Sequence, residues 1–559
     1  MPASRSARRE ARISIAAVQA DSSMTKHPAG MVVAAQPEAV EAGAEVLRNG
    51  GNAVDAAIAC GLVAGVVDPQ MCGIAGFGNL QVYLPDQGIH QCIDFHAKSP
   101  LGTKSDQWAD IIIGETRDGF GFVLEGNVND VGYQAIATPG SLKAYFEAQT
   151  TWGKKDWGEI VEPAIKWAES GFVVRPHVAG WWSEGATMGR AHNVDRLRYS
   201  ATGREIYFRS DGSLKRVGDS VANPDMARTL RLIASEGADV FYGGELGTRI
   251  AEDISAHGGL LDDRDLANYR TTHNEPLQSN YRGLGVMTNH PPGGGVMVLE
   301  MLNILENFDL RSMGHNTVEY VRTVTEAMKR ATSDKDNHVG DPEHFEVPLE
   351  WLISKDHAQE QAQMILAGDR ATVERLSYEP RDTTHVCVVD RDGNAVSMTH
   401  SLGMPSGVIT DGLGFMYNGC MAVFDPRPGN ADSLAPGKSR FSSLCPTMVF
   451  DNEHLKYVVG APGGTQIAMG VTQVLLNSID FDMNMLEAVS APRVSGTSDA
   501  IDVSNGIPWS VTETLEREGY EVIRSPRTHD FAWVHGIRVG PDGVDGGADP
   551  AADGVVQSV

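Results

Sequence analysis

Thr383-Thr-His-Val-Cys-Val-Val-Asp-Arg-Asp-Gly-Asn-Ala-Val-Ser-Met-Thr-His-Ser401 contains two β-branched runs joined by a short turn. The turn is Arg391-Asp392-Gly393, and glycine is favoured at the left-handed position of a three-residue hairpin connection. If Asp390 pairs with Asn394, the antiparallel register sets Thr383 directly opposite Ser401. The stretch therefore predicts a β-hairpin that carries two neighbouring hydroxyl groups at its open end.

The chain on either side of this hairpin changes in character. Apolar periodicity predicts helices at 37–49, 53–67, 296–307 and 317–333, and a mainly helical region from 145 to 255. A polar segment, 377–382, interrupts the pattern, and the 383–559 part is richer in strand-forming residues. Residues 1–27 are expected to be a disordered leader.

Composition excludes several classes of partner. The net charge of -27 repels phosphate backbones and anionic lipid, so we expect no nucleic-acid or membrane partner. The six cysteines form no C-x-x-C pair, which favours reduced, packed thiols over a zinc site or a disulfide framework. The apolar run at 13–18 is shorter than a signal-peptide core, which favours a cytoplasmic location over secretion or the periplasm.

Taken alone, Thr383 is an ordinary strand residue, because threonine is a favoured β former. However, Thr383-Thr384-His385 and Asp390-Arg-Asp-Gly-Asn-Ala-Val396 resemble the start of the small subunit of γ-glutamyltranspeptidases. Further segments resemble this family in the same order: Pro37-Glu-Ala-Val-Glu-Ala-Gly-Ala-Glu-Val-Leu47, Gly50-Gly-Asn-Ala-Val-Asp-Ala-Ala57, Asp265-Leu-Ala-Asn-Tyr-Arg270, Leu302-Asn-Ile-Leu-Glu-Asn-Phe-Asp309, Gly340-Asp-Pro342, Ser442-Ser443 with Pro446-Thr447, Gly460-Ala-Pro-Gly-Gly464 and Ala491-Pro-Arg493. The resemblance implies an α+β fold, the four-layer αββα sandwich of N-terminal-nucleophile hydrolases.

The resemblance also implies a mechanism. Self-cleavage between Asp382 and Thr383 would leave a large segment, 28–382, and a small segment, 383–559, which build one joint catalytic domain as an αβ heterodimer, alone or further dimerised. The new α-amine of Thr383 could then take the proton of its own hydroxyl, because the pKa of a terminal amine in a peptide is about 7.7 to 8. Ser401 aligns with a supporting hydroxyl of the family, and Gly463-Gly464 with its two oxyanion N–H donors.

The residues that recognise a γ-glutamyl group depart from the family pattern. His96 stands where a carboxylate-binding arginine is expected, Val423 where an aspartate binds the α-ammonium, and Gly403 where an asparagine is usual. Ser442 and Ser443, which the family uses against the carboxylate, remain. Valine cannot pair with an ammonium, so we expect an acyl group without an α-amine. Lys98 or Arg440 could replace the arginine, although each can also be a solvated cation.

Three functions are consistent with these residues. The first is an amidohydrolase or acyltransferase acting on a small non-glutamyl or modified acyl amide through an acyl-enzyme on Thr383. The second is a γ-glutamyltransferase with rearranged recognition, and the third is a non-catalytic binding protein, which the retained nucleophile and glycines disfavour. Asp334, Asp336, His338 and Asp341 cluster without a recognised ligand spacing, so we expect a solvated helix end, with neither metal nor cofactor.

Overall fold

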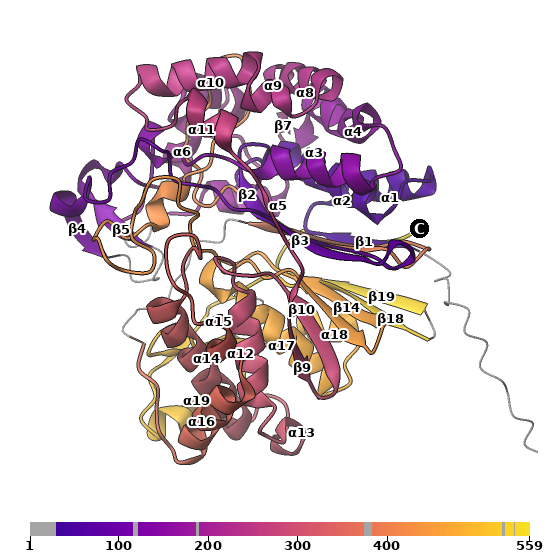
Figure 1. Cartoon of the computed structure of the whole chain (residues 1–559), viewed down its shortest axis with the longest axis vertical. Coiled ribbons are helices and arrows are strands. Elements are labelled where there is room, and N and C mark those ends of the chain that lie inside the picture. Colours follow the sequence, from indigo (N-terminus) through magenta and orange to yellow (C-terminus); the bar gives the residue numbers. More distant parts are fainter. Residues whose placement is uncertain (1–29, 116–120, 186–188, 374–382, 528–530, 542) are drawn as a thin grey trace, which may run out of the picture.

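The computed structural model describes residues 30–115, 121–185, 189–373, 383–527, 531–541 and 543–559. Two large β-sheets face each other in the middle of the molecule, and helices cover the outer face of each sheet (Figure 1). This arrangement is the α+β, four-layer αββα sandwich that the resemblance implied. The leader at 1–27 and Asp382 lie outside the described residues.

Both large sheets are antiparallel throughout. The first contains, in spatial order, β20 (Val555–Ser558), β1 (Met31–Ala34), β11 (Thr384–Val389), β12 (Ala395–Ser401), β2 (Phe77–Leu84), β3 (Ile89–Phe95) and β8 (Thr272–Asn274). The second contains β19 (Gly543–Ala548), β18 (His535–Gly540), β14 (His454–Gly460), β13 (Thr447–Asp451), β10 (Leu284–Thr288) and β9 (Leu277–Tyr281).

The β11–β12 hairpin has the register that its turn predicts. Thr384 pairs with His400, Val389 pairs with Ala395, and the N–H of Asp390 donates to the carbonyl of Asn394 at 2.9 Å. Gly393 has a φ of 81°, the left-handed conformation that favours glycine. The carboxylate of Asp390 also accepts a hydrogen bond from the N–H of Ala53 at 3.0 Å, which ties the turn to the start of a helix.

Each large sheet combines strands from both sides of the 382/383 boundary. β11 lies between β1 and β12, and β12 in turn pairs with β2. In the second sheet, β10 from the first part of the chain pairs with β13 from the second. Backbone hydrogen bonds would therefore hold the two segments together after a cut at this boundary.

The outer helices form two groups. Those over the first sheet and beyond it are α1 (Pro37–Arg48), α2 (Ala53–Val67), α3 (Ser141–Trp152), α4 (Trp157–Ser170), α5 (Pro176–Trp182), α6 (Asn193–Arg198), α7 (Ala201–Tyr207), α8 (Pro224–Glu236), α9 (Asp239–Tyr242), α10 (Glu245–Ala256) and α11 (Asp263–Asn268). Those on the side of the second sheet are α12 (Gly295–Leu305), α13 (Leu310–Met313), α14 (Val318–His338), α15 (Leu349–Leu352), α16 (Lys355–Leu366), α17 (Ile467–Ile479), α18 (Met485–Ser490) and α19 (Trp509–Arg517).

Smaller elements complete the fold. They are the strand pairs β4 (Ile112–Glu115) with β5 (Phe122–Leu124) and β6 (Phe172–Val173) with β7 (Ser220–Val221), the three-stranded sheet of β15 (Val494–Ser495), β16 (Ile501–Val503) and β17 (Val522–Arg524), and short 3-10 turns including η5 (Cys420–Val423) and η6 (Gly464–Gln466). No helix of the described residues is both long and apolar enough to cross a membrane.

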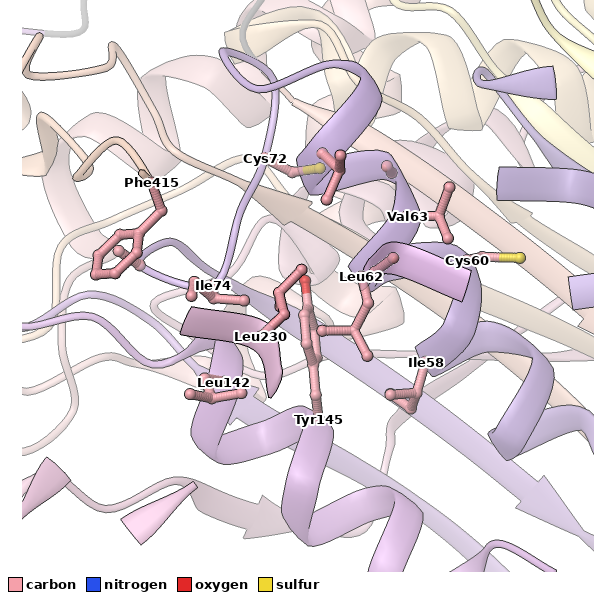
Figure 2. Packing of buried hydrophobic residues seen from close by; sticks show 14 of the residues in the cluster. Ile58, Cys60, Leu62, Val63, Cys72, Ile74, Leu142, Tyr145, Leu230 and Phe415 are labelled. Carbon is pink, nitrogen blue, oxygen red and sulfur yellow. The ribbon is translucent and has the colours of Figure 1, made fainter. Parts of the chain in front are cut away.

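Three apolar cores separate the four layers, and strand alternation distributes side chains between them. On β11, Val386 and Val388 face the core under the first helical layer, whereas Cys387 and Val389 face the core between the sheets. Figure 2 shows part of the first core, where Ile58 and Leu62 of α2 lie near Leu142 and Tyr145 of α3. Because both faces of β11 are covered, the strand is a continuous buried run.

The sequence predicted most of these elements within a few residues. The helix expected at 53–67 has those bounds, and α12 lies within two residues of the prediction at 296–307. The helix expected at 317–333 is α14, which continues five residues further, to His338. The helix expected at 37–49 ends at Arg48. All six cysteines are buried and reduced, as expected.

Candidate active site

Thr383 lies immediately before β11, where the hairpin opens. Its side chain is buried, and its Oγ1 donates a hydrogen bond to the Oγ of Ser401 at 3.1 Å. The Ser401 Oγ also accepts the N–H of Gly403 at 2.8 Å. The predicted pairing of two hydroxyls is confirmed, and Ser401 holds the Thr383 hydroxyl in a defined position.

Gly463 and Gly464 follow β14 and lead through η6 into α17. Both have positive φ, 140° and 57°. Gly464 lines the pocket that contains Thr383. Gly463 lies against Ala532, where a Cβ would approach the Ala532 Cα within 2.5 Å. Close packing thus requires glycine at 463, while Gly464 borders the space where a reacting carbonyl would lie.

A small pocket, partly open to solvent, lies beside the Thr383 hydroxyl. The side chains around it are two arginines, several hydroxyls and an apolar group: Arg190, Arg440, Thr383, Ser401, Ser442, Ser443, Phe77, Met404, Val423, Leu444 and Ile467, with Gly403 and Gly464. Among the described residues, the lining includes no aspartate or glutamate.

Arg440 supplies one of the two cations. Its side chain is buried, its Nε donates to the carbonyl of Phe441 at 2.8 Å, and its guanidinium lies 4.5 Å from the centre of the Phe77 ring. A Cβ on Gly403, which has a φ of 60°, would lie 2.9 Å from the Arg440 Nη1. Glycine at 403 therefore leaves room for the arginine.

Arg190 supplies the other cation, and no sequence motif indicated it. Asp130 lies 3.9 Å from Arg190 and 2.6 Å from Arg196. Although burial alone would raise it, Arg196 and Arg190 hold the pKa of Asp130 below its usual range. Arg190 reaches the pocket from a loop that lies far from Thr383 in sequence, and this explains why spacing could not reveal it.

His96 lies behind the pocket wall. It is 1% exposed, its Nδ1 is 2.7 Å from Asp94 Oδ1, and its Nε2 is 2.5 Å from the Oγ of Ser442. The wall itself includes Ser442 and Ser443, together with Val423 at the end of η5. His96 thus acts on the pocket only through its hydrogen bond to Ser442, whereas Val423 and Gly403 line the pocket directly.

Comparisons with known proteins agree with this geometry. The γ-glutamyltranspeptidase family model matches residues 39–559. The acylase ACY 1 proenzyme of Pseudomonas sp. (strain V22) is 37% identical over 96% of this chain and 95% of that protein. The glutathione hydrolase proenzyme of Escherichia coli (strain K12) is 31% identical over 93% and 90%. The crystal structure of cephalosporin acylase from Bacillus halodurans has a TM-score of 0.84, at 28% identity and 98% coverage of both chains.

The chain belongs to the γ-glutamyltranspeptidase family. It is accordingly a self-processing N-terminal-nucleophile hydrolase that acts on amide bonds. This membership disfavours the non-catalytic alternative. Within the family, the arrangement of Thr383, Ser401 and Gly464 suits acyl transfer. The family's glutamyl-recognition pattern is altered at Val423 in the pocket wall and at His96 behind it.

Lys98 and Arg440, the two cations that could replace the family arginine, lie in different surroundings. Lys98 lines a separate groove, with its Nζ 6.0 Å from the centre of the Tyr269 ring, so it does not join the lining around Thr383. Of the two cations that the sequence offered as a replacement for the family arginine, Arg440 is the one in the pocket.

The acidic cluster near the end of α14 is arranged differently from its sequence pattern. Among the described residues, Asp334 groups with Glu300 of α12 and His357 of α16, and not with Asp336, His338 or Asp341. The His357 Nε2 lies 2.8 Å from Asp334. Although burial alone would lower it, hydrogen bonds to Asp334 and Glu300 raise the pKa of His357 to about 9. A buried ion pair between helices accounts for this group.

Proposed function

We propose that this protein hydrolyses amides of dicarboxylic acids, using Thr383 as nucleophile and Arg440 to bind the free carboxylate of the acyl group. The observation that carries the proposal is that Thr383, Arg440 and Val423 line one pocket that, within the described residues, has no acidic side chain. The substrate class is a monoamide of a short diacid without an α-amino group, such as a glutaryl amide.

The nucleophile is supported by position and chemistry. Cleavage between Asp382 and Thr383 would give Thr383 an α-amine, which can accept the hydroxyl proton as the oxygen attacks the amide carbonyl. The amine then gives the proton to the leaving nitrogen. In the second half of the reaction, water attacks the acyl-enzyme by the same proton transfers and the acid is released. Ser401 orients the Thr383 hydroxyl at 3.1 Å, and the Gly464 backbone borders the position of the developing oxyanion.

Charge selects the acyl group. A buried carboxylate requires a cationic hydrogen-bond partner, and the planar guanidinium of Arg440 can provide two parallel N–H donors. Arg190 adds a second positive charge to the same wall. An α-ammonium would lose its hydration shell beside Val423 and two arginines, and the described lining offers no carboxylate to compensate. The pocket therefore favours a glutaryl over a γ-glutamyl group.

The first test concerns maturation. Intact mass and N-terminal sequencing of the purified protein should give a small fragment that begins at Thr383. A fragment that begins elsewhere, or an intact chain after prolonged incubation, would contradict the assignment of the nucleophile.

The second test uses two substrates that differ only in the α-amine. We expect a kcat/KM for glutaryl-p-nitroanilide at least tenfold above that for γ-glutamyl-p-nitroanilide, since one lost charge-assisted hydrogen bond is worth about 1.5–3 kcal/mol. Val423→Asp should reduce or reverse this ratio, and Val423→Asn, with similar volume and no charge, is the matched control. Equal rates on both substrates, or a ratio unchanged by Val423→Asp, would overturn the proposed acyl specificity.

A further inference from the structure

Asp94, His96 and Ser442 form a continuous hydrogen-bonded series. The Nδ1 of His96 lies 2.7 Å from the Asp94 Oδ1, and its Nε2 lies 2.5 Å from the Ser442 Oγ. Asp94 comes from β3 and His96 follows that strand directly, whereas Ser442 comes from the segment before β13. The fold thus brings an acid, a base and a hydroxyl together in the order that nucleophilic catalysis uses.

The acid fixes the tautomer of the histidine. Asp94 Oδ1 also accepts the backbone N–H of His96 at 2.8 Å, so the same oxygen receives two donors from one residue. A carboxylate can only accept, so in the neutral imidazole the proton lies on Nδ1 and Nε2 is an acceptor. The hydroxyl of Ser442 then donates to Nε2, and its oxygen carries the increased electron density of a base-activated nucleophile.

Burial holds this arrangement rigid. His96 and Ser442 are 1% and 2% exposed, the hydroxyl of Tyr269 donates to the His96 carbonyl at 2.9 Å, and the Ser442 N–H donates to the Pro292 carbonyl at 2.9 Å. The Phe77 ring packs against the imidazole with centroids 5.9 Å apart. Ser442 nevertheless borders the same pocket as Thr383, so a molecule bound there can reach its hydroxyl.

We propose that Asp94, His96 and Ser442 form a second acyl-transfer centre in this pocket, in which Ser442 attacks activated acyl esters independently of Thr383. The Oγ of Ser442 bonds to the ester carbonyl carbon while its proton moves to the His96 Nε2. The ester C–O bond then breaks and His96 protonates the departing alcohol, leaving an acyl-serine. Water attacks this acyl group, His96 takes the water proton and returns it to Ser442, and the acid is released.

This centre gives the replacement of the family arginine a chemical consequence. An arginine at position 96 would be a permanent donor, and Ser442 could then donate its own proton to a substrate carboxylate. With a histidine there, the Ser442 hydroxyl donates its hydrogen bond to Nε2 of His96 and cannot donate to a substrate carboxylate. Carboxylate binding then depends on Arg440. The inference concerns Ser442 alone and does not require that Thr383 be the amide nucleophile.

The test is covalent labelling of the mature wild-type protein with a fluorophosphonate, which reacts with base-activated serine hydroxyls, followed by peptide mass mapping. We expect Ser442 to be modified. The labelled protein should lose the part of its p-nitrophenyl acetate hydrolysis that Ser442 carries out. His96→Gln should slow labelling of Ser442 by about a hundredfold to ten-thousandfold, the usual contribution of a general base. His90→Gln lies on β3, the strand that His96 follows, but is remote from Ser442 in its contacts; it is the matched control and should label at the wild-type rate.

Comparing labelling with folding separates a chemical role of His96 from a structural one. His96→Gln should slow labelling of Ser442 while self-cleavage and the circular dichroism spectrum stay as in the wild-type protein. Labelling confined to Thr383, or labelling of Ser442 that His96→Gln leaves unchanged, would overturn the inference while the proposed amidase function stands.

Discussion

The two sides of the pocket differ in how far they follow the family pattern. On the side of the hairpin, Thr383 and Gly464 keep the residue types of the family, Ser401 keeps a hydroxyl where threonine is usual, and all three lie on or directly beside regular elements. On the opposite side, His96, Val423 and Gly403 depart from the pattern, and Arg440 occupies the space that Gly403 opens. The chemistry of acyl transfer and the recognition of the acyl group can therefore change separately.

A physical reason underlies this separation. The hairpin lies in the centre of a sheet covered on both faces, where a shift of one residue would turn every side chain to the other face. The recognition wall is assembled from short turns and loops, such as η5 and the segment before β13, where substitutions are tolerated more easily. Four predictions test this comparison, beginning with the largest effect.

Loss of the nucleophile should abolish activity altogether. Thr383→Ala is expected to prevent self-cleavage and to reduce amide hydrolysis by at least about four orders of magnitude, as removal of a nucleophile does in hydrolases that act through an acyl-enzyme. Thr383→Ser should retain cleavage at a reduced rate. The control is Thr384→Ser, since the Thr384 hydroxyl bonds to Gln36 and points away from the pocket lining. Gel analysis and nitroanilide release measure both effects, and cleavage in Thr383→Ala would refute the assignment.

The hairpin side of the pocket was predictable from sequence, because local geometry determines it. The turn glycine at 393 fixes the register of the hairpin, and the register alone places Thr383 opposite Ser401. Asp390 strengthens the turn by accepting the N–H groups of Asp392 and Asn394 at 2.9 and 3.0 Å. These contacts join residues close in sequence, which is where spacing is informative.

The altered side was predicted less completely. The family pattern placed His96 at the carboxylate site. Its imidazole instead contacts Asp94 and Ser442, and it is Ser442 that lines the pocket. Arg190 was missed because only tertiary packing brings its loop to the pocket. Likewise, Glu300 and His357 meet Asp334 through the packing of three helices, a contact that no sequence spacing indicates.

Removal of the proposed carboxylate partner should have the next largest effect. Arg440→Gln is expected to lower kcat/KM for glutaryl-p-nitroanilide by about ten- to a hundredfold, which corresponds to the 1.5–3 kcal/mol of a hydrogen bond to a charged group. Self-cleavage should continue, because Thr383 and Ser401 are unchanged. Lys98→Gln, which alters a cation outside this pocket, is the matched control. Equal losses in the two variants would mean that the overall charge, and not Arg440, governs the rate.

Acid should weaken the fold through the sheets behind the nucleophile. Burial lowers the pKa of His400 to about 3, so between about pH 6.5 and 3 the unfolded chain binds one more proton than the native chain at this residue. Stability is therefore lost as pH falls, by up to about 1.4 kcal/mol per pH unit. Urea midpoints of Thr383→Ala protein at pH 7 and 5 should differ less when His400→Gln is added. An unchanged difference would exclude His400 as the source.

The smallest effect should come from restoring the family residue at position 403. Asparagine tolerates a φ of 60° better than most residues, so Gly403→Asn should fold, but its Cβ would lie 2.9 Å from the Arg440 Nη1. Forcing Arg440 off its rotamer costs on the order of 0.5–1.5 kcal/mol, about three- to tenfold in kcat/KM for the glutaryl substrate. Combined with Arg440→Gln, the same substitution should have almost no further effect, because the displaced group is already gone. Additive losses in the double variant would show instead that Gly403 acts through the Ser401 hydroxyl, to which its N–H donates, and that the two sides of the pocket are coupled.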